Sequence, residues 1–182
     1  MSIWDKWAQG LNKVVTGNRR RRAILTPIAA ILFFGIITLF VLASFWVDKW
    51  LNLPHLPNAW WRYGLAAIIF IAGFILAIST LTPFFRSRGS PVPTIPPPKL
   101  ITTGLYAYVR NPMALGGLLM LEGLGFYYGS LSLIIVCAPL PVLLYALWIK
   151  AVEEPELEMR FGQDYREYKK RVPMFIPRFK KH

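Results

Sequence analysis

Residues 111–149 of the chain read "NPMALGGLLMLEGLGFYYGSLSLIIVCAPLPVLLYALWI". This stretch runs for 39 positions with a single charged residue, Glu122. A helix crosses a bilayer in ~20 mostly apolar residues, so this run is long enough for two crossings. Near its middle, at residues 127–130, stands "YYGS", and aromatic and turn-forming residues favour an interfacial turn. We therefore expect two membrane helices, at about 112–128 and 131–150, in a tight hairpin.

Two further apolar runs precede this stretch. Ala23–Val47 has no charged residue over 25 positions, and Tyr63–Phe85 has none over 23 positions. Each is long enough for one membrane helix, which we place at about 23–47 and 63–83. The sequence therefore predicts an all-α integral membrane protein with about four transmembrane helices.

The tail after the hairpin predicts one more helix, on the cytoplasmic side. Pro155 suits a first helical turn, because the N–H group that proline lacks has no partner there. Leu157, Phe161, Tyr165 and Tyr168 then recur at helical spacing. This periodicity predicts that one face of the C-terminal helix packs against the rest of the molecule.

Charge sets the orientation and the class of partner. The 182 residues are 55% hydrophobic, yet the chain carries a formal net charge of +12. The N-terminal segment, the second loop and the tail hold 19 of the 21 lysines and arginines. The positive-inside rule therefore places both termini in the cytoplasm. We expect the bacterial inner membrane rather than the endoplasmic reticulum, anionic lipids at the cytoplasmic face, and no nucleic acid as partner.

Composition divides the chain into three parts. Residues 1–22 form a basic segment, in which "IWDKWAQGLNKVV" at 3–15 is compatible with an interfacial amphipathic helix and equally with a disordered tail. Residues 23–98 hold two membrane helices and a proline-rich cytoplasmic loop. Residues 99–182 form the expected functional core. Cys137 is the single cysteine, so neither an intrachain disulfide nor a cysteine-based metal site is expected.

A polar cluster stands at the mouth of the third helix, in "YVRNPMALGG" at 108–117. Asn111 is suited to cap that helix, and Pro112 fits its first turn. Helix N-termini attract carboxylates and phosphates. Gly116 and Gly117 would let another backbone or a flat ligand approach closely. The tail glutamates Glu153 and Glu154 return to the same membrane face.

Two of these motifs together resemble a known family. "TTGLYAYVRNPMALGG" and, some 35 residues later, "EEPELEMRFGQDYREYKKRVPMFIP" are similar to the isoprenylcysteine carboxyl methyltransferase family and its bacterial, phospholipid methyltransferase-like relatives. The resemblance covers about Lys99–Pro177. It implies S-adenosylmethionine as cofactor, methyl transfer to a lipophilic acceptor in the membrane, and no metal. The cofactor contacts that it implies fall on Lys99, Leu100, Ile101, Tyr106, Asn111, Pro112, Met113, Ala114 and Glu153.

The chain departs from the family pattern at three positions. Asn111 occupies the position of a histidine common in the family, and Ala114 that of a frequent tyrosine. An arginine of the eukaryotic enzymes aligns near Ile149. The acceptor is therefore open between a carboxylate, an amine, a thiol and another small lipophilic group. Arg110 and Glu154 are expected as catalytic-site residues, in a substrate-side or supporting role.

Three other functions compete with methyl transfer. One is a non-catalytic membrane protein that binds anionic lipid. Another is a small transporter that uses the intramembrane carboxylate of Glu122. A related fold that reduces sterols would bind a nicotinamide cofactor instead.

Overall fold

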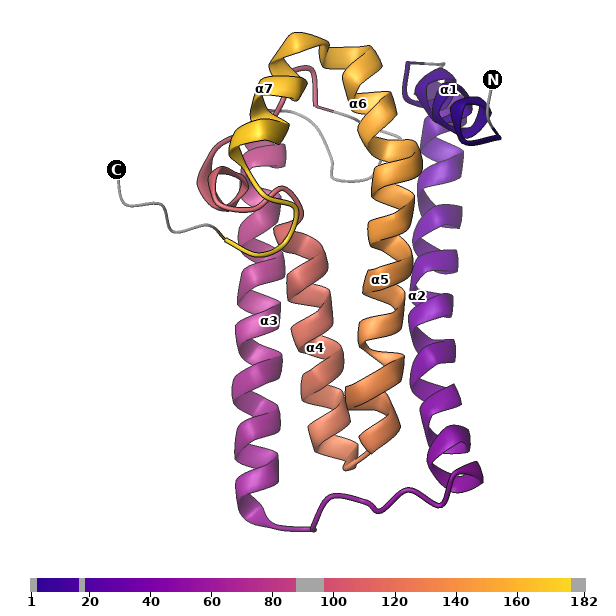
Figure 1. Cartoon of the computed structure of the whole chain (residues 1–182), viewed down its shortest axis with the longest axis vertical. Coiled ribbons are helices and arrows are strands. Elements are labelled where there is room, and N and C mark those ends of the chain that lie inside the picture. The colour runs from indigo at the N-terminus through magenta and orange to yellow at the C-terminus, as the bar shows by residue number, and fades with distance from the viewer. Residues whose placement is uncertain (1–2, 17–18, 88–96, 178–182) are drawn as a thin grey trace. The chain divides into compact units, whose positions relative to one another are not determined.

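The computed structural model describes residues 3–16, 19–87 and 97–177, and within these ranges the regular elements are helices (Figure 1). This confirms the all-α expectation. The longer elements are α1 (Ile3–Thr16), α2 (Arg19–Trp50), α3 (Trp60–Arg86), α4 (Pro112–Tyr128), α5 (Pro139–Trp148), α6 (Glu154–Phe161) and α7 (Gln163–Arg171). A 3₁₀ turn at Gly104–Ala107 and π-helical turns at Leu133–Cys137 and Ile149–Glu153 complete the described chain.

Two helices among the described residues are long and apolar enough to cross a membrane, Trp60–Phe84 and Leu133–Phe161. The second one corrects the sequence-based boundaries. We expected a helix to end near residue 150 and a new one to start at Pro155. Pro155 does lie in the first turn of α6, but α6 continues from the preceding helix without a break. The Ile149–Glu153 π turn lies directly before the proline. A π turn widens the helix locally, which relieves the clash between a proline ring and the preceding turn.

The other expected boundaries are close to those observed. The helix expected at 112–128 coincides with α4, while α2 and α3 extend a few residues beyond the expected 23–47 and 63–83. The expected C-terminal helix is two helices, α6 and α7. Gly162 separates them with a φ of 56°, a conformation that side-chain-bearing residues seldom adopt.

The chain divides into two units of internal contact. Unit 1 consists of Met1–Ala29, Ser79–Pro112 and Tyr145–His182, and unit 2 consists of Ala30–Ile78 and Met113–Leu144. Unit 2 contains the helical hairpin, in which α4 and the helix after the turn run antiparallel (Figure 1). Its turn is formed by Gly129, whose φ is 71°, as the "YYGS" motif predicts.

In unit 2, α3 and α4 approach each other backbone to backbone. A Cβ atom placed on Gly116 would lie 2.8 Å from the Ala77 nitrogen and 2.9 Å from the Gly73 carbonyl oxygen. The expectation that glycine permits close approach is therefore confirmed at Gly116. A Cβ atom on Gly117 would meet nothing within 4 Å, so this glycine faces open space.

A buried polar cluster ties the end of α2 to the hairpin turn in the same unit. The Ser130 hydroxyl donates to Asp48 Oδ2, and the Ser132 N–H donates to Asp48 Oδ1 at 2.9 Å. The Ser132 hydroxyl donates to the Ser44 carbonyl at 2.7 Å. All four residues are buried. Asp48 thus supplies the acceptors that a buried helix start requires.

Candidate functional site

The candidate site lies in unit 1, where the segment before α4 meets the tail. Lys99 is exposed, Leu100 and Ile101 are half-buried, and the 3₁₀ turn that follows carries Tyr106. The Tyr106 ring packs edge-on against Phe84, with centroids 5.7 Å apart. Burial raises the pKa of Tyr106 to about 12; its hydrogen bond with Thr80 opposes the shift and the negative charge of Glu153 adds to it. Tyr106 is therefore a neutral phenol within electrostatic reach of Glu153.

Glu153 lies in the π turn that precedes α6. Its Oε2 accepts a hydrogen bond of 3.3 Å from the Tyr145 hydroxyl. Tyr145 was not foreseen as a site residue, although a tyrosine about two helical turns before the glutamate was a usable signal. A carboxylate has about four acceptor positions, so the contact with a neutral phenol leaves Glu153 able to accept further donors.

Glu154, the next residue, is held by two cations. Arg110 Nη1 lies 2.5 Å from Glu154 Oε1, and Lys169 Nζ lies 2.5 Å from Glu154 Oε2. The Glu154 side chain is only 5% exposed. Arg110 also donates to the Tyr165 hydroxyl at 3.3 Å. Both carboxylate oxygens of Glu154 are therefore engaged, and the buried charge is compensated as burial demands.

Lys169 is a site residue that sequence reasoning missed. Besides Glu154 it binds Glu158 at 3.2 Å. Burial disfavours the charged ammonium, but the hydrogen bonds to Glu154 and Glu158 outweigh this effect and raise the pKa of Lys169. The spacing of Lys169 from Glu158, 11 residues, spans the break at Gly162, so helical periodicity gave no signal for this contact.

The tail is bound along the segment that leads into α4. The Arg110 N–H donates to the Pro173 carbonyl at 2.9 Å, and the Asn111 N–H donates to the Met174 carbonyl at 3.1 Å. These contacts use two of the backbone donors that precede the helix. Pro112 has none, so Met113 and Ala114 carry the first-turn N–H groups that lack an acceptor within α4.

The tyrosine row of the tail forms the small core under this site. Tyr165 and Tyr168 are buried together with Val172, and Leu100, Leu157 and Phe161 pack against them. The expected packing face of the C-terminal helix is thereby confirmed, although it is shared between α6 and α7. The Tyr168 hydroxyl donates to the Tyr106 carbonyl at 2.7 Å. Tyr168 thus fixes the backbone of the turn that presents Tyr106.

The predicted residues thus fall into two groups. Those from Lys99 to Pro112, with Glu153 and Glu154, belong to unit 1, whereas Met113 and Ala114 are the next residues of α4 and belong to unit 2. Glu122 is half-buried in α4, also within unit 2. Among the described residues there is no group of three or more His, Cys, Asp or Glu side chains arranged to hold a metal ion.

Comparison with known proteins adds a family to this geometry. Residues 61–164 match the sequence model of the phospholipid methyltransferase family. The matched range includes α3, the segment before α4, the hairpin and Glu153, and it excludes α1 and α2.

Characterised relatives match 43% of the chain. Protein-S-isoprenylcysteine O-methyltransferase of Homo sapiens is 34% identical over 85 residues, and the Mus musculus and Xenopus laevis proteins of that name are 33% and 32% identical. Each match covers 43% of this chain and 27% of the relative. The chain therefore matches about a quarter of the length of these relatives. No solved structure matches the chain.

Proposed function

Because the chain belongs to the phospholipid methyltransferase family, we propose that it transfers a methyl group from S-adenosylmethionine to a lipophilic acceptor embedded in the membrane. One observation carries this proposal. The two motif segments, some 35 residues apart in sequence, are joined in unit 1 by the Arg110–Glu154 ion pair and by the approach of Tyr106 to Glu153. Residues that lie on separate motifs thus share one site.

The residues present fit the amino-acid end of the proposed cofactor. Its amino group needs a carboxylate, and Glu153 has acceptor capacity beyond its contact with Tyr145. Its carboxylate needs N–H donors, which helix starts offer. The proposed contact set keeps the sequence-based assignment: Lys99, Leu100, Ile101, Tyr106, Asn111, Pro112, Met113, Ala114 and Glu153.

When bound, S-adenosylmethionine supplies an electrophilic methyl group on a sulfonium. The work left to the protein is to align the acceptor and to exclude water. Tyr106, half-buried and neutral, contributes an apolar ring and a phenol that stays protonated at physiological pH. No residue needs to act as a strong base if the acceptor is an ionised carboxylate or a thiolate; an amine must lose its proton to solvent or to a nearby carboxylate.

We propose that Arg110 and Glu154 are positioning residues. Both Glu154 oxygens bind cations, so this carboxylate is poorly placed to exchange protons with a substrate. The ion pair instead fastens the residue before α4 to the residue after Glu153. Loss of the Arg110–Glu154 ion pair would therefore shift Glu153 and the start of α4, which both belong to the proposed cofactor site.

We further propose four membrane spans, formed by α2, α3, α4 and the helix from Leu133. The apolar runs of the sequence support four spans, and the basic residues support both termini in the cytoplasm. We propose the bacterial inner membrane as the location. Anionic lipids and the lipophilic substrate are the expected partners. In this scheme residues 1–22 are interfacial, 23–98 are the first spans and their loop, and 99–182 are the catalytic core.

A methyl-transfer assay tests the proposal and distinguishes between the candidate acceptor groups. Purified protein in lipid nanodiscs receives S-adenosylmethionine labelled in its methyl group, together with either a farnesylated cysteine or phosphatidylethanolamine. Transfer to one acceptor in preference to the other supports the activity and identifies a carboxylate or an amine as its target. A folded protein that transfers label to neither these acceptors nor a panel of lipophilic thiols would contradict the proposal.

A further inference from the structure

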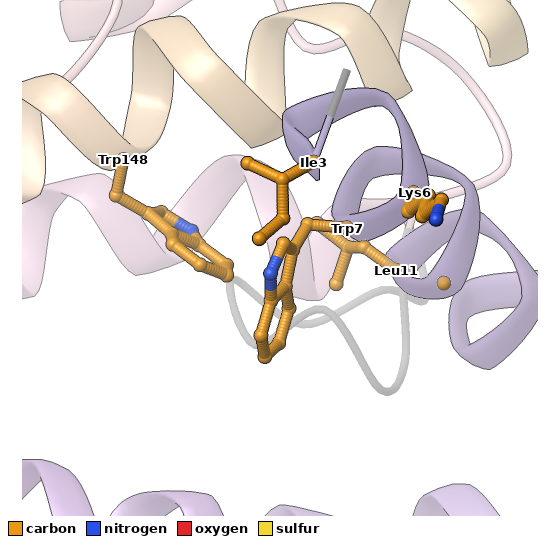
Figure 2. A pocket seen from close by; sticks show the side chains of 6 residues that line it. Ile3, Lys6, Trp7, Leu11 and Trp148 are labelled. Atoms are coloured by element: carbon orange, nitrogen blue, oxygen red, sulfur yellow. The ribbon is translucent and has the colours of Figure 1, made fainter. Parts of the chain in front are cut away.

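An apolar groove in unit 1 lies between α1 and Trp148, outside the site described above. Its volume is about 490 Å³. Figure 2 shows the Trp7 and Trp148 rings side by side, with Ile3 above Trp7, and with Lys6 and Leu11 on the side of Trp7 away from Trp148. The lining consists of Ile3, Lys6, Trp7, Gly10, Leu11 and Trp148. All of these except Lys6 are apolar, so the groove has an apolar lining with a single cationic side chain.

Helix α1 is docked by one face and leaves the groove face open. It packs against the Ile149–Glu153 π turn and against α6. Ala8 is 1% exposed on the docked side, whereas Ile3 is 65% and Trp7 is 56% exposed. The Trp7 and Trp148 rings meet edge to face, with centroids 6.1 Å apart. Helix α1 is therefore held in place by its buried face, while its large apolar side chains in the groove remain exposed.

Gly10 keeps this groove open. A Cβ atom on Gly10 would meet nothing within 4 Å, so no neighbouring backbone requires glycine there. Glycine weakens a helix compared with other residues. Gly10 lies on the same helix face as Lys6, four residues later, so its missing side chain leaves space in the groove next to Lys6.

We propose that this groove binds one acyl chain of an anionic phospholipid, with the Lys6 ammonium beside the headgroup phosphate. The volume falls within the ~300–1,000 Å³ of pockets that hold small apolar ligands. Tryptophans on an amphipathic helix are typical of the headgroup layer. The cationic contact and the net charge of +12 select an anionic lipid over a zwitterionic one.

The inference does not depend on methyl transfer. Helix α1 lies outside residues 61–164, which match the family, and the expected observable is lipid binding rather than turnover. The groove is nevertheless connected to the candidate site through packing, because α1 contacts the turn that carries Glu153. A bound lipid would hold α1 against that turn.

Native mass spectrometry of the full chain in mild detergent tests the charge contact. The protein is titrated with phosphatidylglycerol and, separately, with phosphatidylcholine of the same chains. One lysine near a lipid surface gives a preference of about fivefold for the anionic lipid. Lys6→Gln should abolish this preference, whereas Lys13→Gln, an equal charge change at an exposed position of α1 outside the groove, should retain it. Equal effects of both variants, or no preference in the wild type, would overturn the proposal.

Filling the groove tests the apolar contact. Gly10→Leu places a side chain in open space, and leucine favours helix more than glycine does, so α1 should remain folded. We expect it to lower the occupancy of both lipids at least severalfold, and Gly10→Ala to lower it much less. Circular dichroism confirms equal helix content. If Gly10→Leu binds lipid as the wild type does, the lipid sits elsewhere, and if the wild type retains neither lipid, the groove is not a lipid site.

Discussion

Replacing Gly116 by alanine tests the packing of α3 on α4. The new Cβ would lie 2.8 Å from the Ala77 nitrogen and 2.9 Å from the Gly73 oxygen, both backbone atoms that cannot rotate away. Overpacking of this kind costs about 3 kcal/mol at the upper end of its range, and the better helix propensity of alanine returns about 1 kcal/mol. We expect a net loss of about 2 kcal/mol in the free energy of unfolding.

Gly117→Ala is the matched control, one residue along the same helix. Nothing lies within 4 Å of its Cβ position, so only the propensity gain of about 1 kcal/mol remains. The two variants should therefore differ by about 3 kcal/mol, which is measurable by unfolding in mixed micelles of mild detergent and dodecyl sulfate. Equal stability of the two variants, or a lower stability of Gly117→Ala, would refute the close approach of the helices.

Three further predictions concern polar groups. Arg110→Gln should lower the free energy of unfolding by about 3 kcal/mol, because Glu154 stays buried with one cation fewer; the double variant with Glu154→Gln should lose less, as chemical denaturation will show. Asp48→Ala should cost about 2 kcal/mol, since two buried donors lose their acceptor; thermal unfolding measures it. The pKa of Tyr106 is raised to about 12 in the folded state. The contribution of this shift to the free energy of unfolding is therefore fully present below pH 10 and lost between pH 10 and 12. Over that pH range, the melting temperature of Tyr106→Phe should fall less steeply than that of the wild type.

Each of these predictions has an outcome that contradicts it. Additive losses in the Arg110 and Glu154 variants would show that the two side chains do not interact. An Asp48→Ala protein as stable as the wild type would mean that water replaces the carboxylate in the hairpin cluster. Identical alkaline melting curves for the wild type and Tyr106→Phe would place that phenol in solvent.

The sequence predicts the helices of this fold well, because the signals for them are local. The apolar run of residues 111–149 defines α4 and its partner helix, and the "YYGS" motif defines the turn at Gly129. Gly116 was expected to permit a close approach, and it does. Tyr165 and Tyr168 were assigned to a packing face from helical spacing alone, and both are buried.

The sequence predicts the connections poorly, because they depend on contacts between distant residues. Pro155 usually marks a new helix, but the π turn before it lets one helix continue from Leu133 to Phe161. The second cation on Glu154, Lys169, is brought there by the break at Gly162. The cofactor assignment itself came from the family resemblance, since no spacing rule connects Tyr106 with Glu153.

Calorimetric titration of S-adenosylmethionine into the full chain in nanodiscs most directly tests whether this is a methyltransferase site. Wild type should bind saturably, and Glu153→Gln should weaken binding about ten- to a hundredfold through loss of a charge-assisted hydrogen bond. Glu167→Gln, an equal change at an exposed position of α7, should leave the affinity unchanged. No saturable binding by folded wild type, or equal affinity of the Glu153→Gln protein, would contradict the assignment.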